Sequence, residues 1–555
     1  MPEKKTYGRT IRAPVLVYGG TVAGVGAALA AARQGYDTLL VERGNHCGGM
    51  TTSGLGSIDL LRKNAVGGIF TEFLHKVRAH YWERYGKDSE EYRLTYDGYF
   101  MEPSVAQSVL DDMLAAQAHL TTLLRHELIE VVKDGQMVTG SVYRNRDTGE
   151  TLLVKHEVAI DGTYEGDLAA AAGARCRFGR EGRKEYDERF AGVIFHDWRF
   201  NRQEIHPAST GEPSPFVQAY CFRATLTDDP KTRLPFPRPD SYEEFLPLYR
   251  GLLKDFASGR TRTFREIIWL NPLANRKYCS NGHIESLTSL NLAEFNRDWP
   301  DGNWDKRDSL FKLYKDYTIG FWHFLQNDPG VPLMPRLEAN CMGLPPDEYP
   351  DEGHFPWQLY VREARRIFGE YVYTEHDCIP EPGRQRPSIH PDTIMICEHS
   401  FDCHPCRNRG EDSLVLTDDG FELLEGTIWF RNKLKAINRP STVPYRTIVP
   451  EAIDGLLVPA ALSATHVAFS AVRMEPVWMA AGQAAGMAAV QAIEQNVPLR
   501  RVDVQALQEV LASQGQVMVY FDGLALDDPD FARVQLAAIT ENTPHYDVDR
   551  VKEAL

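Results

Sequence analysis

The sequence predicts an α/β protein in which a parallel-sheet domain is interrupted by a long insertion of mixed α and β structure. Three observations lead to this prediction. A strand–turn–helix–strand pattern occupies residues 14–42, a short apolar run and a helix of small residues occupy residues 454–493, and the stretch between them is rich in aromatic residues and proline. The predicted parts are a first domain segment over 12–174, an inserted substrate or cap domain over 175–440, a second domain segment over 441–500 and a C-terminal helical extension over 501–555.

The first strand is expected at residues 15–18, which are uniformly apolar and therefore suit a buried parallel strand. They lead into the turn GGTVAG at 19–24, and a helix of small residues is predicted over 25–33. Gly35 is then a suitable left-handed residue just after the helix end. A second strand over 38–41 ends at Glu42.

The glycines of this turn and the acidic residue after the second strand together predict a Rossmann-like dinucleotide site. A pyrophosphate must approach backbone N–H groups at a helix N-terminus, so side chains in the turn must be small. Gly19 permits the tight turn, and Gly24 allows close helix–strand packing. Thr21 replaces the usual middle glycine, and Gly20 beside it supplies the lost clearance. Glu42 is placed to accept hydrogen bonds from ribose hydroxyls.

Two later stretches are expected to complete the nucleotide domain. Residues 123–143 are predicted to form a β-meander with a turn at 134–135, and a turn at 147–149 leads into a strand that ends at Asp161 and Gly162. Residues 454–458 are typical of a last strand of the same domain. A small-residue helix over 477–493 follows, with Pro476 at its first position.

Several of these segments carry a family resemblance. RGNHCGGMTTSGLG at 43–56 resembles the glycine-rich segment that runs past the pyrophosphate toward the isoalloxazine in glutathione-reductase-like flavoproteins. IDGTYEGDLAAAAG at 160–173 and SATHVAFSAVRMEP at 463–476 fit the same pattern. Together they resemble the FAD-dependent oxidoreductase family of the glutathione-reductase superfamily, and within it a branch of about this length that is catalogued generically or under the label xanthan lyase.

The resemblance implies FAD as the cofactor. The residues assigned to FAD binding are Gly19, Gly20, Thr21, Gly24, Glu42, Arg43, Gly48, Gly49, Met50, Leu128, Asp161 and Gly162. In the resembling flavoproteins, the helix that corresponds to residues 477–493 directs its positive end at the flavin C2 carbonyl, which stabilises the anionic reduced flavin.

Flavin-dependent dehydrogenation needs a group that takes a proton from the substrate. His466 is the first candidate because it lies just before the helix aimed at the flavin, and a structural role in a tight turn is its alternative. His404 is the second candidate, oriented by Asp402, although a surface or core histidine fits the sequence equally. Arg473 is expected to hold the flavin or an anionic substrate group, or else to form a structural ion pair.

Cys403 and Cys406 form a C-x-x-C pair in the same segment. A thioredoxin-like redox pair would need a strand before it and a helix after it, and no convincing helix follows. A zinc site would need two more ligands, for which His399 or Asp402 is available at a cramped spacing. No metal site is therefore predicted.

The leading interpretation is dehydrogenation of a small organic substrate by hydride transfer to flavin N5, at a CH–OH group of a sugar or polyol. It draws on six tryptophans of the middle segment, whose faces stack on sugar rings but also fill cores. They are Trp198, Trp269, Trp299, Trp304, Trp322 and Trp357. An FAD-dependent desaturase or amine oxidase and a flavin monooxygenase are the alternatives.

The net charge of −16 argues against nucleic acid or an anionic membrane as a partner. No stretch approaches the roughly 20 apolar residues of a membrane helix. The nine cysteines are scattered and odd in number, unlike a disulfide framework, which favours the cytoplasm. The expected partners are a small-molecule substrate and an electron acceptor whose kind the sequence does not specify.

Overall fold

The central element of the molecule is a five-stranded sheet in the order β20-β8-β2-β3-β4, in which neighbouring strands are parallel. The computed structural model describes residues 7–200 and 203–554. The strands of this sheet are β2 (Val15–Tyr18), β3 (Thr38–Val41), β4 (Leu120–Leu123), β8 (Val158–Asp161) and β20 (Leu456–Leu457). The predicted α/β class with a parallel sheet is confirmed. The last strand, from far along the chain, pairs directly with β8.

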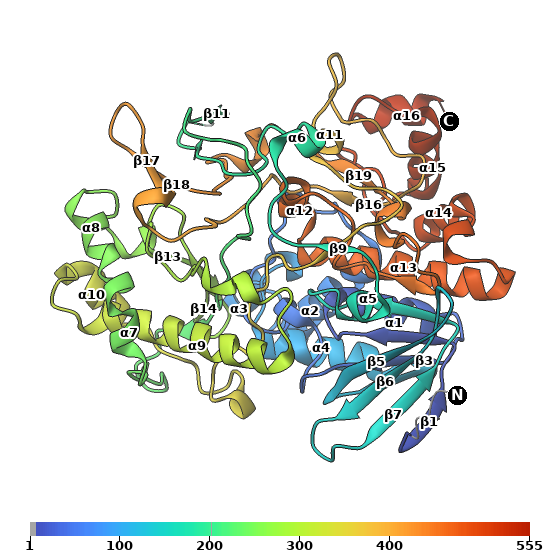
Figure 1. Ribbon diagram of the computed structural model, residues 1–555, viewed down its shortest axis with the longest axis horizontal. Coiled ribbons are helices and arrows are strands. Elements are labelled where there is room, and N and C mark those ends of the chain that lie inside the picture. The colour runs from blue at the N-terminus through green and yellow to red at the C-terminus, as the bar shows by residue number, and fades with distance from the viewer. Residues whose placement is uncertain (1–6, 201–202, 555) are drawn as a thin grey trace.

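Two helices that are distant in sequence, α1 (Val22–Arg33) and α13 (Glu475–Gln495), pack against each other beside this sheet (Figure 1). Glycines allow their backbones to meet. A Cβ on Gly482 would lie 1.9 Å from the Ala23 carbonyl oxygen, and one on Gly26 would lie 2.5 Å from the Met479 carbonyl oxygen. The small residues of α13, which the sequence suggested for packing on the sheet, therefore serve mainly the contact with α1.

Helix α1 begins at Val22 rather than at Val25 because Thr21 caps it. The Thr21 hydroxyl accepts a hydrogen bond from the Gly24 N–H group at 3.4 Å, which satisfies one of the free amides of the first turn. The helix ends as predicted, with Gly35 at a left-handed φ of 82° just beyond it.

A second sheet, in the order β1-β7-β6-β5, lies beside the parallel one. Its strands are β1 (Arg9–Arg12), β5 (His126–Asp134), β6 (Met137–Asn145) and β7 (Thr151–Lys155). The predicted meander is present as β5, β6 and β7. The first and last apolar runs, each expected to be one strand, are wrong in that respect, because each forms two strands. The chain turns at Arg125, whose φ is 59°, to pass from β4 into β5, and it breaks between β7 and β8 because these two strands belong to different sheets. An apolar run alone does not show such a change of sheet.

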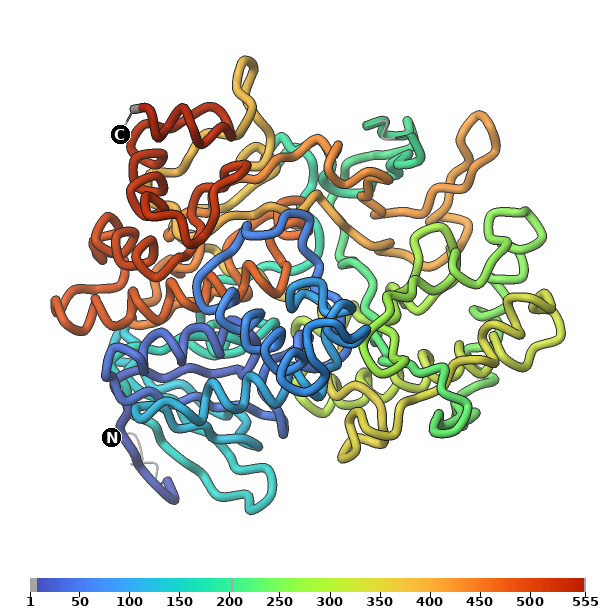
Figure 2. The backbone as a smooth tube through the Cα atoms, turned by 180° about the vertical axis from the view of Figure 1, so that it is seen from behind, coloured from blue at the N-terminus to red at the C-terminus, as the bar shows by residue number. Residues whose placement is uncertain are grey.

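The middle of the chain combines short strands with helices. Its helices α7 to α10 lie away from the sheet of β5, β6 and β7 in both views (Figure 1, Figure 2). The elements are β9 (Cys176–Arg177), α6 (Arg183–Tyr186), β10 (His196–Asp197), β11 (Glu204–Ile205), β12 (Thr225–Thr227), α7 (Tyr242–Tyr249), α8 (Gly251–Ala257), β13 (Ile268–Leu273), β14 (Lys277–Gly282), α9 (Trp304–Asn327), α10 (Leu333–Asn340), β15 (Arg366–Ile367), α11 (Glu375–Cys378), β16 (Thr393–Cys397), β17 (Leu414–Leu416), β18 (Glu422–Leu424) and β19 (Ser441–Pro444). Strands β12, β14 and β13 form an antiparallel sheet.

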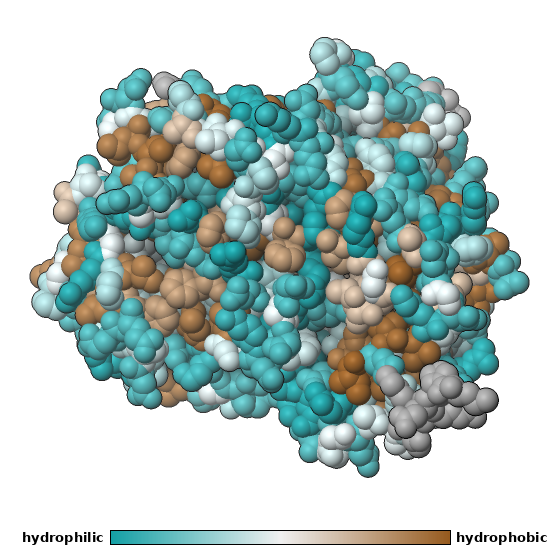
Figure 3. All heavy atoms as spheres, in the orientation of Figure 1, coloured by the Kyte–Doolittle hydropathy of each residue, from teal (hydrophilic) through white to brown (hydrophobic). Residues whose placement is uncertain are grey.

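The remaining helices lie within residues 68–172 and 466–554. They are α2 (Gly68–Tyr85), α3 (Glu90–Arg93), α4 (Pro103–Ala115), α5 (Asp167–Ala172), α12 (His466–Val472), α14 (Val504–Ser513), α15 (Phe531–Glu541) and α16 (Val548–Ala554). The face shown in Figure 3 is mainly hydrophilic, with separate hydrophobic patches. Within residues 7–200 and 203–554, no helix is long and apolar enough to cross a membrane.

Candidate functional site

A cavity of about 370 Å³ lies at the carboxyl ends of β2 and β3, where Rossmann-like sheets bind dinucleotides. We call it the nucleotide cavity. Of the residues predicted to bind the cofactor, Gly19, Thr21, Glu42 and Arg43 line it. The Glu42 carboxylate accepts hydrogen bonds from the N–H groups of Gly20 and Gly44, both at 2.6 Å. Glu42 therefore ties the glycine turn to the end of β3 as well as facing the cavity.

The turn between β2 and α1 has no room for side chains. A Cβ on Gly24 would lie 1.9 Å from the Gly19 carbonyl oxygen, and a Cβ on Gly162 would lie 2.8 Å from the same oxygen. Gly19 itself has a φ of 96°. Three glycines from β2, α1 and β8 thus pack backbone against backbone, which leaves the helix N-terminus open toward the cavity. This arrangement fits a pyrophosphate.

The other predicted cofactor residues do not line the nucleotide cavity as it stands within the described ranges. The Asp161 carboxylate accepts three hydrogen bonds, two from Thr163 and one from the Ala169 N–H group, so it shapes the turn after β8. Burial raises its pKa to about 7. The Leu128 N–H group donates to the Tyr18 hydroxyl at 3.2 Å.

The CGGM segment forms a short 3₁₀ turn next to the cavity. Gly48 has a φ of 108°, and a Cβ on Gly49 would lie 2.1 Å from the Tyr164 hydroxyl. The same hydroxyl accepts a hydrogen bond from the Met50 N–H group at 3.0 Å. Since Tyr164 lines the cavity, Gly48, Gly49 and Met50 lie behind this part of its wall.

Sequence reasoning missed much of the lining. Arg125 and Arg146, which add positive charge, were missed, whereas Trp299, Trp304 and Trp357 were singled out for a substrate and instead line the nucleotide cavity. The Arg43 guanidinium lies 3.9 Å from the centre of the Trp304 ring. A signal existed for Arg125, because it follows β4, and the carboxyl ends of parallel strands meet at one edge of a sheet. Trp304 arrives on α9 from the middle of the chain, which no local pattern indicates.

Helix α13 begins with a buried carboxyl group that the sequence analysis also missed. Glu475 Oε1 accepts a hydrogen bond from the Tyr164 hydroxyl at 2.7 Å, and Oε2 accepts one from the Thr51 hydroxyl at 3.2 Å. Burial raises the pKa of Glu475 to about 8, although these hydrogen bonds oppose the shift. The start of α13 is thereby joined to the CGGM segment and to the wall of the nucleotide cavity.

A second cavity, of about 280 Å³, is formed where distant segments converge. We call it the Trp269 cavity. The hairpin of β13 and β14 supplies Trp269, Asn271 and Asn281, and these share one face because Trp269 pairs with Asn281 across the ladder and side chains alternate along a strand. Asp59 and Arg223, paired at 3.0 Å, also line the cavity.

The predicted pair of Asp402 and His404 lines this cavity together with Lys433. Lys433 Nζ lies 2.5 Å from Asp402 Oδ2, and His404 Nε2 lies 3.7 Å from Asp402 Oδ1. Burial opposes ionisation of Asp402, but the ammonium of Lys433, together with His404, His399 and Arg473, outweighs it. The pKa of this carboxyl therefore lies well below its usual range. Burial, with help from the Arg362 guanidinium, lowers the pKa of His404.

The other two predicted catalytic residues lie behind this pair. Arg473 donates to the Asp402 carbonyl at 2.8 Å and to the Tyr360 hydroxyl at 3.0 Å. His466, at the start of α12, lies with Nδ1 2.7 Å from a Glu363 carboxylate oxygen and Nε2 3.2 Å from Cys403 Sγ. The four residues are thus gathered in one region, but neither Arg473 nor His466 lines the Trp269 cavity in the described ranges.

Several buried polar atoms around the cavity have no hydrogen-bond partner among the described residues. They are His404 Nδ1, Arg473 Nε, Arg362 Nε and Asn281 Oδ1. Buried polar groups in folded proteins are almost always satisfied. Of these four residues, His404 and Asn281 line the cavity, so their unpartnered atoms fit a surface that receives polar ligand atoms.

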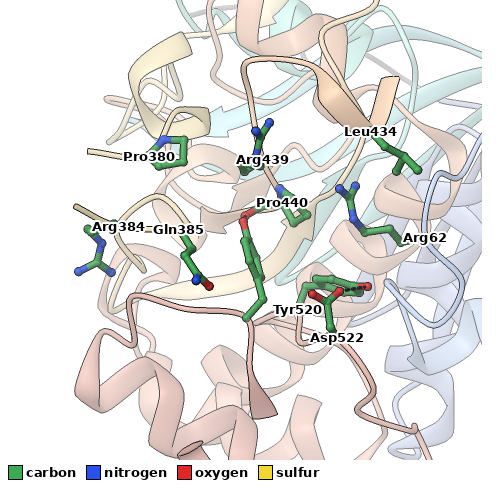
Figure 4. A pocket seen from close by; sticks show the side chains of 10 residues that line it. Arg62, Pro380, Arg384, Gln385, Leu434, Arg439, Pro440, Tyr520 and Asp522 are labelled. Atoms are coloured by element: carbon green, nitrogen blue, oxygen red, sulfur yellow. Dashed lines mark hydrogen bonds between the residues drawn. The ribbon is translucent and has the colours of Figure 1, made fainter. Parts of the chain in front are cut away.

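A third cavity, of about 490 Å³, lies near the C-terminal segment and contains none of the predicted site residues (Figure 4). Its three arginines already have partners in the protein. Arg62 pairs with Glu398 at 3.4 Å, Arg384 donates to the Asn542 side chain at 2.8 Å, and Arg439 donates to the Asn438 carbonyl at 3.0 Å. Each guanidinium group of this cavity is therefore already held by contacts within the protein.

Comparison with solved structures finds likeness over about a third of the chain. Glycerol-3-phosphate dehydrogenase from Bacillus halodurans complexed with FAD matches at 14% identity and a TM-score of 0.22, over 34% of this chain and 43% of that chain. The 3-ketosteroid-Δ4-(5α)-dehydrogenase from Rhodococcus jostii matches at 14% identity and 0.21, over 35% and 58%. L-proline dehydrogenase from P. horikoshii matches at 15% identity and 0.18, over 33% and 26%. The chain thus spans less than two thirds of each protein, and TM-scores this low carry no argument.

The family comparison covers far more. No curated protein sequence matches the chain. A family model described as FAD dependent oxidoreductase, however, matches residues 14–511. This match includes the glycine turn, the Trp269 cavity and the start of α13. The chain accordingly belongs to the FAD-dependent oxidoreductase family and is an enzyme with FAD as its cofactor.

Proposed function

We propose that this enzyme dehydrogenates a CH–OH group of a sugar or polyol bound in the Trp269 cavity. The observation that carries the proposal is the lining of this cavity, which combines two tryptophans with amide and charged groups. Of the six tryptophans singled out in the sequence, Trp269 lines it, and Trp429 joins it there. Trp198 and Trp322 are buried, and the other three line the nucleotide cavity.

The chemistry of the lining suits a hydroxylated molecule. Trp269 is 52% exposed, so its ring is available for a ligand. Asn281 stands beside it and offers amide donors and an acceptor for hydroxyl groups. Asn271 holds the Trp269 ring by accepting from its N–H group at 2.9 Å and donates to the Ser57 hydroxyl at 2.9 Å. The cavity of about 280 Å³ lies near the lower end of the roughly 300–1,000 Å³ that ligand pockets occupy. A small ring or short polyol matches this size and polarity.

The proton-accepting group in this proposal is His404. Its ring lies at the cavity surface, and Asp402 beside it is anchored by Lys433 through the ion pair and by Arg473 through the backbone carbonyl. A fixed carboxylate next to an imidazole orients the ring and favours its protonated form once it has taken the substrate proton. FAD, when bound, supplies the acceptor for the hydride that leaves the same carbon.

The finer placement of the nucleotide domain belongs to the same proposal. We assign residues 12–174 and 441–500 to one domain of the glutathione-reductase type, residues 175–440 to the inserted substrate domain and residues 501–555 to a helical extension. The pairing of β20 with β8 and the packing of α13 on α1 support the first assignment. The boundary at residue 440 is not sharp, because β16 of the inserted segment pairs with β19 and packs on α13, which both lie after it.

Substrate class is tested by anaerobic reduction of the bound flavin. Sugars and polyols are expected to bleach the oxidised flavin spectrum, whereas amines, 2-hydroxy acids and saturated acyl compounds are not. Asn281→Ala is expected to raise the substrate concentration that gives half-maximal reduction about 10-fold. The reason is that a lost hydrogen bond in a pocket costs roughly 1–2 kcal/mol. Leu416→Ala, at an exposed residue outside the cavity, is the control. Reduction by an amine but by no polyol would replace the proposal with amine oxidation.

A further inference from the structure

Two thiols and an imidazole meet behind the Trp269 cavity. Cys403 Sγ lies 3.8 Å from Cys406 Sγ and 3.2 Å from His466 Nε2. All the possible ligand atoms of this Cys2His cluster lie within 4.8 Å of one another, and each residue is buried. The third member comes from α12, so the C-x-x-C spacing alone did not reveal it.

Two of these separations resemble those between ligands around one tetrahedral ion. In zinc sites the metal–sulfur distance is about 2.3 Å and the metal–nitrogen distance about 2.0–2.1 Å, which at tetrahedral angles places two sulfurs about 3.8 Å apart and a sulfur and a nitrogen about 3.5 Å apart. The observed Sγ–Sγ separation of 3.8 Å agrees, and the 3.2 Å contact is close. The Sγ–Sγ separation of 3.8 Å is also far from the roughly 2.05 Å of a disulfide bond.

The histidine of the cluster is held as metal-binding histidines are held. A carboxylate only accepts hydrogen bonds, so the contact of 2.7 Å between Glu363 and His466 requires the proton on Nδ1 and leaves the Nε2 lone pair facing Cys403. Glu363 is itself fixed by Arg366 at 3.2 Å. A carboxylate behind the ligating imidazole is the usual support of a metal-bound histidine.

The charges around the cluster also favour a dication. Two bound thiolates offset the charge of one divalent ion. Two arginines on this side are paired with carboxylates: Arg180 with Glu425 at 2.6 Å, and Arg366 with Glu181 at 2.8 Å and Glu363 at 3.2 Å. A dication held by two thiolates adds no net charge to the buried region, which favours its burial.

We propose that Cys403, Cys406 and His466 bind one thiophilic divalent metal ion of the zinc class. Binding replaces the two thiol protons, which are released to solvent, and leaves one coordination position for a ligand other than the residues of this cluster. The ion would clip the loop that carries Asp402 and His404 to the start of α12. The site stands on these contacts alone and does not depend on the substrate proposed above.

The test uses full-length, FAD-loaded enzyme without a histidine tag, purified without chelator and analysed for metals by mass spectrometry. The parent is expected to retain about one zinc ion per chain, and Cys406→Ser and His466→Gln less than about a tenth of that. Cys341→Ser, which removes an exposed thiol elsewhere, is the matched control and is expected to keep its metal. Cobalt substitution of the parent is expected to give d–d absorption in the red, where oxidised flavin does not absorb.

Glu363→Gln tests the proposal even if the ligand variants do not fold, because it keeps all three ligands. It is expected to lower the affinity for zinc about 10–100-fold, measured by competition with a chelator. Flavin absorbance reports whether each variant is folded. The proposal is overturned if the parent contains no metal and binds none when zinc or cobalt is added. It is equally overturned if intact mass shows a Cys403–Cys406 disulfide in the parent, or if Cys406→Ser keeps the full metal content.

Discussion

Gly24→Asp is expected to abolish FAD binding. A Cβ at this position would lie 1.9 Å from the Gly19 carbonyl oxygen, and because that oxygen is part of the backbone no side-chain movement relieves the clash. The turn must open, which displaces the N–H groups at the start of α1, and the new carboxylate places negative charge beside the pyrophosphate. Overpacking of this kind costs on the order of 1–3 kcal/mol, or about 5- to 150-fold in FAD affinity, and the repulsion of the pyrophosphate by the carboxylate is expected to remove the remaining binding.

The measurement is the flavin released by acid from purified protein. The parent is expected to be yellow and to release about one FAD per chain, and Gly24→Asp is expected to be colourless and to stay so after incubation with FAD. Gly24→Ala separates the steric effect from the charge. Gly410→Ala is the control, because the nearest atom to its new Cβ is the movable Ser413 hydroxyl at 3.3 Å. If Gly24→Asp loads FAD like the parent, the nucleotide site has been assigned to the wrong turn.

His404→Ala is expected to slow flavin reduction by about 10²–10⁴-fold while FAD stays bound, since this is the usual effect of removing a group that accepts a proton in the transition state. His404 lines the Trp269 cavity next to the Asp402–Lys433 ion pair, and its Nδ1 has no hydrogen-bond partner among the described residues. Stopped-flow reduction by a substrate found in the anaerobic screen measures the rate. Added imidazole is expected to restore part of it.

Two further variants show whether the effect belongs to the proton acceptor. His119→Ala removes a surface histidine that pairs with Asp37 and is expected to reduce at the parent rate. His466→Ala tests the other histidine predicted from the sequence, whose ring faces Glu363 and Cys403. If His466→Ala is slow while FAD stays bound and His404→Ala is fast, the roles of the two histidines are exchanged. Loss of FAD from His404→Ala would make that residue structural.

The sequence by itself determined the nucleotide-binding unit. The strand, the glycine turn, the helix and Glu42 all lie within residues 14–42, and the structure builds them as β2, α1 and β3 in the predicted order. Local chemistry is sufficient here, because the close contact between Gly24 and Gly19 is made within a single turn. Gly162, the third glycine that packs in this turn, was also predicted from the sequence, since it follows an apolar run typical of a strand.

Only the tertiary structure decided what surrounds the predicted catalytic residues. The Trp269 cavity joins Asp59, Arg223, the β13–β14 hairpin and the segment around Asp402, which are far apart in the chain and meet through packing. His466 acquired Cys403 and Glu363 as neighbours in the same way. Spacing along a sequence reports contacts within one turn or one strand pair, whereas these contacts depend on how whole elements pack, and side chains that converge from separate elements leave no periodic pattern to read.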